Sequence, residues 1–188
     1  MTPINWSDYT IEYKEAGDLL LANAVKTKRR NFMVFPTIFL YRHYIELILK
    51  EIILNDREYL GISHPFPRSH NIYELWKMCR DYMQQTDKLV DPRFAESERY
   101  KKEIIPMYDA LEADLNKFAE IDPDSQYFRY PVDGKGNPIA VDNKRLSELL
   151  HELPELVVRI AYNLDGISTG SYQILQDKYE ALAQQKNP

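Results

Sequence analysis

The stretch from residue 35 to residue 54, FPTIFLYRHYIELILKEIIL, is apolar around almost its whole circumference when it is read as a helix. It nevertheless carries Arg42, His43, Glu46 and Lys50. At about 100° per residue, Arg42 and Glu46 fall among the apolar positions, so both are expected to be buried. Because burial of a lone charge costs several kcal/mol, we expect the two to pair with each other and with a third polar group from another segment.

Length and composition favour one domain over residues 1–188. With 188 residues, 44% of them hydrophobic, the chain is long enough for one substantial core and short for two. A formal charge of −5 argues against a surface that attracts nucleic acid throughout. One basic run remains, KTKRR at residues 26–30, which a solvated turn between two helices also explains.

The cysteine content and the hydropathy pattern indicate in which cellular compartment the protein is expected. Cys79 is the one cysteine, which excludes an intramolecular disulfide and fits a reducing compartment. Residues 1–17 are acidic and polar, unlike a secretion signal. Arg42, Glu46 and Lys50 interrupt the best apolar stretch before it reaches the roughly 18 residues that a membrane span needs. We therefore expect a soluble, cytoplasmic protein with no membrane contact.

Apolar residues at spacings of three and four predict helices on both sides of the central stretch, which should itself end between Asn55 and Gly61. Ser69 is the expected N-cap of the next helix, and Gly166 and Gly170 are expected to end the helix that begins at residue 143. The predicted segments beside the central one are residues 6–24, 70–86, 104–118, 143–164 and 172–182.

The segment of residues 121–142 is different in kind, because it is dense in turn residues. Extended runs at residues 127–132 and 138–141 flank the sequence DGKGN, which predicts a small β-hairpin or an Ω-like loop. The expected fold class is therefore all-α, a five- to six-helix bundle with a small β-hairpin insertion around residues 127–141.

The sequence gives little support for a metal or cofactor site. No metal-binding spacing connects the four histidines, at positions 43, 64, 70 and 151, and the glycines form no phosphate-binding loop. We expect neither a metal nor a cofactor. Cys79 shares an apolar helical face with Trp76 and Met83, so we interpret it as a core residue rather than a nucleophile.

The side chains that remain for chemistry are Arg42, His43, Glu46, His70 and Arg129. Arg129 stands between aromatic residues in the turn-rich segment, and Glu46 is its expected partner. Two interpretations are open. In one, a salt-bridge network pins the hairpin to the central helix; in the other, the same groups line a pocket for a phosphate or a nucleotide, with His43 or His70 available for acid–base work.

Three motifs, YRHYIELILKEII, SHNIYELWKM and DPDSQYFRYPVD, occur in this order in the chain. Together they resemble the HEPN superfamily of prokaryotic helical domains, and within it a branch with Arg-His-x-x-Glu, His-Asn and Phe-Arg-Tyr-Pro motifs. The resemblance covers roughly residues 33–164. It implies a helical bundle that forms a homodimer and serves a toxin–antitoxin, antiphage or RNA-processing system, in many members as a metal-independent endoribonuclease.

The catalytic signature of that superfamily is an arginine, four to six intervening residues and a histidine on a late helix. Arg145 and His151 match it within RLSELLH, and Arg57 and His64 match it across a helix end. The resemblance implies that the histidine assists attack of a ribose 2′-OH and that the arginine stabilises the developing charge. Leu146 departs from the family, which usually has a polar residue after the arginine. An exposed face of an amphipathic helix also explains Arg145 and His151.

Three functions follow as hypotheses. The first is a ribonuclease that uses Arg145 and His151. The second is a non-catalytic module that binds RNA, a nucleotide or a protein partner from the same system through the cluster of Arg42, Glu46, His70 and Arg129. The third is a dimerisation or scaffold domain in which that cluster is structural.

Overall fold

The computed structural model describes residues 5–27, 30–121, 135–137 and 143–186. Almost all of these residues are helical, which confirms the all-α prediction. The elements are α1 (Trp6–Thr27), α2 (Arg30–Leu60), α3 (Ile72–Val90), α4 (Pro92–Ala95), the π-helical turn η1 (Tyr100–Ile104), α5 (Ile105–Ile121) and α6 (Asn143–Lys186).

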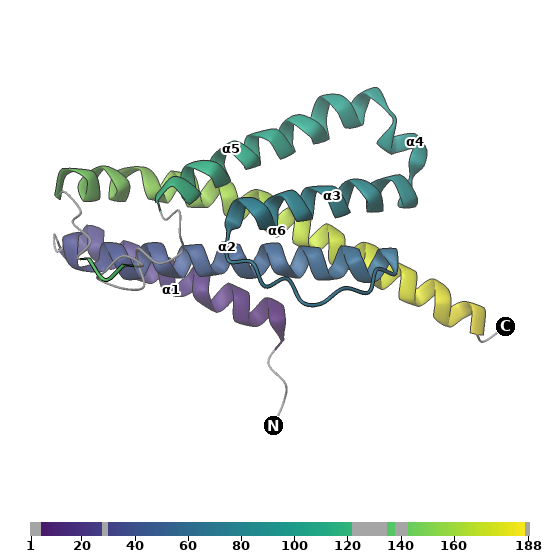
Figure 1. Cartoon of the computed structure of the whole chain (residues 1–188), viewed down its shortest axis with the longest axis horizontal. Helices are drawn as coiled ribbons and strands as arrows, with labels where there is room; N and C mark the ends of the chain where they lie inside the picture. The colour runs from purple at the N-terminus through teal and green to yellow at the C-terminus, as the bar shows by residue number, and fades with distance from the viewer. Residues whose placement is uncertain (1–4, 28–29, 122–134, 138–142, 187–188) are drawn as a thin grey trace.

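Helix α2 lies at the centre of the bundle, against α1, α3 and α6 (Figure 1). Every residue from 44 to 50 is buried. The three neighbouring helices therefore explain why apolar residues occur on nearly every side of this part of α2, since none of residues 44–50 is exposed. Burial of each large apolar side chain in this core contributes about 1.5–3 kcal/mol. The largest fully buried side chains include Trp76, Tyr41, Tyr44 and Phe118.

Helix α1 approaches α2 closely because Gly17 has no side chain. A Cβ atom at Gly17 would come within 2.9 Å of the Tyr41 ring. The Tyr41 hydroxyl donates a hydrogen bond of 2.8 Å to Asp18, and the Trp6 indole donates one of 3.2 Å to the carbonyl of Leu47. These contacts fix α1 along α2 and set the position of its polar residues.

Helix α3 is capped by Asn71 rather than by Ser69, so that prediction was wrong by two residues. The Asn71 side chain accepts hydrogen bonds from the backbone N–H groups of Tyr73 and Glu74, as an N-cap does. Ser69 supports this cap, because its hydroxyl accepts from the Asn71 N–H and donates to Glu74. His70 therefore precedes the helix instead of lying in its first turn.

Helix α6 runs without interruption through Gly166 and Gly170, contrary to the prediction that they end it. A glycine inside a helix costs about 1 kcal/mol relative to alanine, which does not by itself end a helix. Both glycines lie at exposed positions, whereas Leu164, Ser171 and Leu175 around them are buried. Packing on both sides of the glycines continues the helix through them.

The predicted β-hairpin around residues 127–141 falls mostly outside the described residues. The part that is described, residues 135–137, forms a turn with Gly136 at a φ of +83°. In the ranges that the structure covers there is no strand, so the hairpin part of the fold prediction is unsupported.

A buried carboxylic acid, Asp56, lies on α2 near the hydroxyl groups of Thr86 on α3 and Ser171 on α6. Burial raises the pKa of Asp56 to about 7. The two hydroxyl groups act in the opposite direction, and the nearby charge of Asp87 adds to the rise. Asp56 is thus neutral in acid and charged above neutral pH, inside a core that favours the neutral form.

We expect the stability of the fold to fall with rising pH on account of Asp56. Between its ordinary pKa of 3.8 and its folded pKa of about 7, the folded state binds the extra proton, so the free energy of unfolding decreases as pH rises through this range. Between pH 5 and pH 8 the free energy of unfolding of the wild type should fall by about 2–3 kcal/mol more than that of Asp56→Asn, as measured by urea denaturation at each pH. A difference between the two proteins that does not vary with pH would contradict this assignment.

Candidate functional site

The segment that joins α2 to α3, residues 61–71, has no helix or strand and runs back along α2 (Figure 1). We call it the strap. The first residues of the strap fold back onto the end of α2, where the backbone N–H of Ile62 donates a hydrogen bond of 2.9 Å to the carbonyl of Arg57. Two arginines of α2 then bind its carbonyl groups. Arg57 donates to Pro65 at 3.1 Å, and Arg42 donates to His70 at 2.8 Å.

Glu46 is the carboxylate around which this region is arranged. Its side chain is 3% exposed, and one oxygen, Oε1, accepts from the ammonium of Lys50 and from Nδ1 of His70, both at 2.8 Å. The guanidinium of Arg42 lies 3.7 Å from the other oxygen. We call Arg42, Glu46, Lys50 and His70 the Glu46 cluster. Its geometry confirms the expected buried pair and identifies His70 as the third group, from another segment.

The electrostatics of Glu46 favour its charged form. Burial alone would raise the pKa of this carboxyl group, but Lys50 and His70 outweigh burial and hold the pKa below its ordinary value. Glu46 is therefore ionised near neutral pH and can only accept hydrogen bonds. It follows that Nδ1 of His70 carries a proton in this contact, whether the imidazole is neutral or charged.

His70 combines a fixed orientation with access to solvent. Its side chain is 57% exposed, although its Nδ1 is bound to the buried Glu46. A histidine that donates from Nδ1 to a carboxylate has its other nitrogen, Nε2, set for acid–base chemistry or for a polar contact. Within the Glu46 cluster, His70 is therefore the side chain best placed to contact a ligand or to transfer a proton.

The same side of α2 carries more positive than negative charge. Arg57 lies seven residues after Lys50, which places the two on one face of the helix. Arg57 is buried, and within the described ranges no carboxylate lies within ion-pair distance of it. Lys50 also lies over the ring of Phe66 in the strap, at 5.4 Å from its centroid. Among the described residues of α2, the three basic side chains of Arg42, Lys50 and Arg57 therefore face the strap together with the carboxylate of Glu46.

The other residues that were predicted to join this cluster are placed elsewhere or are not described. His43 packs between aromatic rings, 4.4 Å from the centroid of Tyr13 and 6.0 Å from that of Phe39, so it belongs to the contact between α1 and α2. Arg129 lies outside the described residues. Cys79 is a buried core residue as predicted, and burial raises the pKa of its thiol.

Arg145 and His151 both lie in the N-terminal part of α6. His151 is exposed, and the side chain of Arg145 is not among those described. Six residues along one continuous helix turn by about 600°, so the two positions lie roughly 120° apart around the axis. One copy of α6 does not place both positions on a single face.

Two residues of α2 that contact the strap, Lys50 and Arg57, were not predicted as part of the site from the sequence. Lys50 was not assigned to the site, although its spacing of four residues from Glu46 is the signal that would have found it. Arg57 was considered only in the spacing with His64. A buried arginine bound to the carbonyl of a following loop leaves no pattern in the sequence.

Comparisons of the chain with protein-family models, with curated proteins and with solved structures give no match. Membership of the HEPN superfamily therefore remains a prediction that is based on the three sequence motifs. In the described helices, no segment is both long and apolar enough to cross a membrane. Across the same ranges, no three His, Cys, Asp or Glu side chains converge as metal ligands.

We expect Glu46→Gln to lower the free energy of unfolding by about 3–5 kcal/mol, because it leaves the charges of Lys50 and Arg42 buried without their carboxylate. Adding Lys50→Met to this variant should restore part of the loss, since it removes one of these charges. Urea denaturation at pH 7 measures both effects. Glu155→Gln, at an exposed position of α6, is the control and should change stability by less than about 0.5 kcal/mol. A loss below about 1 kcal/mol for Glu46→Gln would show that the cluster does not hold this region together.

Proposed function

We propose that this protein is a helical module of the HEPN type that binds RNA or a nucleotide at the strap, within a prokaryotic toxin or antiphage defence system. The observation that carries the binding proposal is the charge of the strap and of the α2 face beneath it. His64, Arg68 and His70 are exposed on the strap, above the buried side chains of Lys50 and Arg57. A local positive potential of this kind attracts phosphate groups even when the whole chain is acidic.

Two contacts support a phosphate as the ligand. Arg57 is bound to a neutral carbonyl rather than to a carboxylate, so its charge is not cancelled within the described residues. His70 is held by Glu46 through Nδ1 and its ring is accessible, so its Nε2 is oriented to meet a phosphate oxygen, to which the protonated ring donates. The buried cations would supply the field, and the strap residues would supply the direct contacts.

A metal-independent endoribonuclease is the catalytic form of this proposal. His151 would assist attack of a ribose 2′-OH on the adjacent phosphate, and Arg145 would stabilise the charge that develops there. The HEPN resemblance implies that the arginine and the histidine come together across two copies of the chain, and the separation of about 120° between positions 145 and 151 on α6 is compatible with that arrangement. A homodimer is therefore part of the catalytic proposal, and a protein partner from the same system would regulate it in the cytoplasm.

A scaffold or dimerisation domain is the second candidate, and a specific observation favours it. Arg42 and Arg57 donate hydrogen bonds to carbonyl groups of the strap, as groups that only clamp a loop would do. In this alternative the Glu46 cluster has no ligand, and its loss would lower stability alone.

Binding is tested by the fluorescence anisotropy of a labelled single-stranded RNA over a series of salt concentrations. We expect Arg68→Gln to raise the Kd about fivefold and to reduce the slope of log K against log salt by about 0.7, since one phosphate contact is lost. Arg93→Gln makes the same charge change at an exposed position of α4 and should leave both values unchanged. Equal effects of the two variants would contradict binding at the strap, and a wild type that shows no salt-dependent binding would favour the scaffold.

Catalysis is tested by the cleavage of a panel of single-stranded RNAs and tRNAs in EDTA. The wild type is compared with His151→Ala and His70→Ala at an equal folded fraction, measured by circular dichroism. If the ribonuclease proposal holds, His151→Ala abolishes cleavage even at saturating RNA, whereas His70→Ala, which removes a contact of the strap, raises the KM but still cleaves at saturating RNA. A wild type that cleaves no RNA contradicts the ribonuclease and leaves the binding module, which the anisotropy series tests separately.

A further inference from the structure

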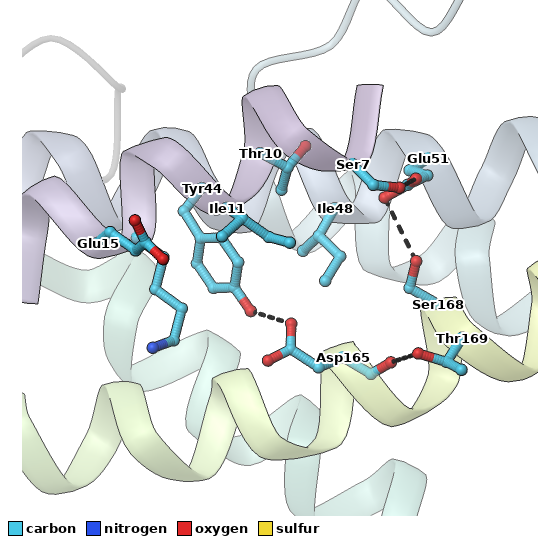
Figure 2. Close-up of a pocket in the computed structure, with 11 residues that line it drawn as sticks. Ser7, Thr10, Ile11, Glu15, Tyr44, Ile48, Glu51, Asp165, Ser168 and Thr169 are labelled. Carbon is cyan, nitrogen blue, oxygen red and sulfur yellow. Dashed lines mark hydrogen bonds between the residues drawn. The ribbon is translucent and has the colours of Figure 1, made fainter. Parts of the chain in front are cut away.

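A pocket of about 340 Å³ lies where α1, α2 and α6 meet (Figure 2). Its α2 residues, Tyr44, Ile48 and Glu51, lie on the side of the helix roughly opposite the Glu46 cluster. The pocket is thus separate from the strap and from the function proposed for it. Its size falls near the lower end of the range of about 300–1,000 Å³ that is typical of small-molecule sites.

Neutral hydroxyl groups hold two carboxylates at the edge of this pocket. The two oxygens of Glu51 accept hydrogen bonds from Ser7 on α1 and, at 3.3 Å, from Ser168 on α6. Asp165 accepts one of 2.7 Å from the hydroxyl of Tyr44. Burial raises the pKa of Tyr44 far above its ordinary value, so this hydroxyl remains a donor. Both carboxylates are therefore oriented without being neutralised.

The pocket has an excess of negative charge. Within the described ranges, no cation lies within ion-pair distance of Glu51 or Asp165. Glu15 adds a third carboxylate to the lining. Lys14 is the one basic residue of the lining, and it is bound to Asp18 at 2.9 Å. A ligand that complements this lining carries positive charge.

The pocket also has an apolar middle. The side chains of Ile11 and Ile48 lie between Tyr44 on one side and Glu51 on the other (Figure 2). A bare metal ion does not match such a lining, and the described carboxylates do not converge in a metal-binding arrangement. Charged groups at the two ends of a short methylene chain match it better, because the chain can cover the isoleucines.

We propose that this pocket binds an aliphatic diamine, with one ammonium group at Asp165 and the other at Glu51. Each ammonium group has three N–H donors, which fit carboxylate oxygens that already accept one hydrogen bond from a hydroxyl. The methylene groups between them contact Ile11 and Ile48. Serine and tyrosine hydroxyls hold both carboxylates in place before the ligand enters, which lowers the cost of ordering them.

The test is isothermal titration calorimetry of the wild-type protein with putrescine at constant ionic strength. We expect saturable binding of putrescine, weaker binding of n-butylamine, which has one ammonium group, and none of butanediol, which has no charge. Asp165→Asn and Glu51→Gln keep the size of each side chain and should each raise the Kd about tenfold. Glu180→Gln makes the same charge change at an exposed site near the end of α6 and should leave the Kd unchanged.

Three results would overturn the proposal. The first is no binding of putrescine to the folded wild type at concentrations up to about 10 mM. The second is an equal heat from magnesium chloride, which would indicate a general counter-ion effect. The third is an affinity that Asp165→Asn and Glu51→Gln leave unchanged while thermal melting shows that both remain folded. None of these results bears on RNA binding at the strap, which Arg68→Gln tests independently.

Discussion

The contact on which this structure depends most is the one between the buried carboxylate of Glu46 and the groups around it. The strap has no regular structure, so its carbonyl groups need donors from elsewhere. Arg42 and Arg57 supply them from α2. Those arginines and Lys50 bring positive charge into the core, and Glu46 is the carboxylate that offsets part of it. Through His70 the same carboxylate also binds the strap directly, just before α3 begins.

Local sequence patterns predicted the central part of the fold well. Charges four residues apart in an apolar helix indicated the Arg42–Glu46 pair, because burial of one charge requires the other. Patterns at helix ends were less informative. Ser69 and Asn71 are both good caps, and only the backbone path selects Asn71. Gly166 was expected to end a helix, but the burial of α6 residues on both sides of it outweighs the free-energy cost of a glycine inside a helix.

The pocket between α1, α2 and α6 could not have been found from the sequence. Glu51 and Asp165 are separated by more than a hundred residues and belong to no motif. They come together because α2 packs against both α1 and α6, and their hydroxyl partners lie on other helices. The proposal that the strap binds RNA or a nucleotide arose instead from sequence motifs, and the positive charge of the strap supports it. The two surfaces lie on different sides of α2, so one ligand need not affect the other.

The central claim, that an ionised Glu46 holds the strap through Nδ1 of His70, is tested most directly by the tautomer of that histidine. Long-range ¹H–¹⁵N NMR of the neutral imidazole distinguishes a proton on Nδ1 from one on Nε2. We expect Nδ1 to carry the proton, because an ionised carboxylate can only accept a hydrogen bond. A proton on Nε2 would mean that the contact with Glu46 is absent in solution, and that the strap is held in some other way.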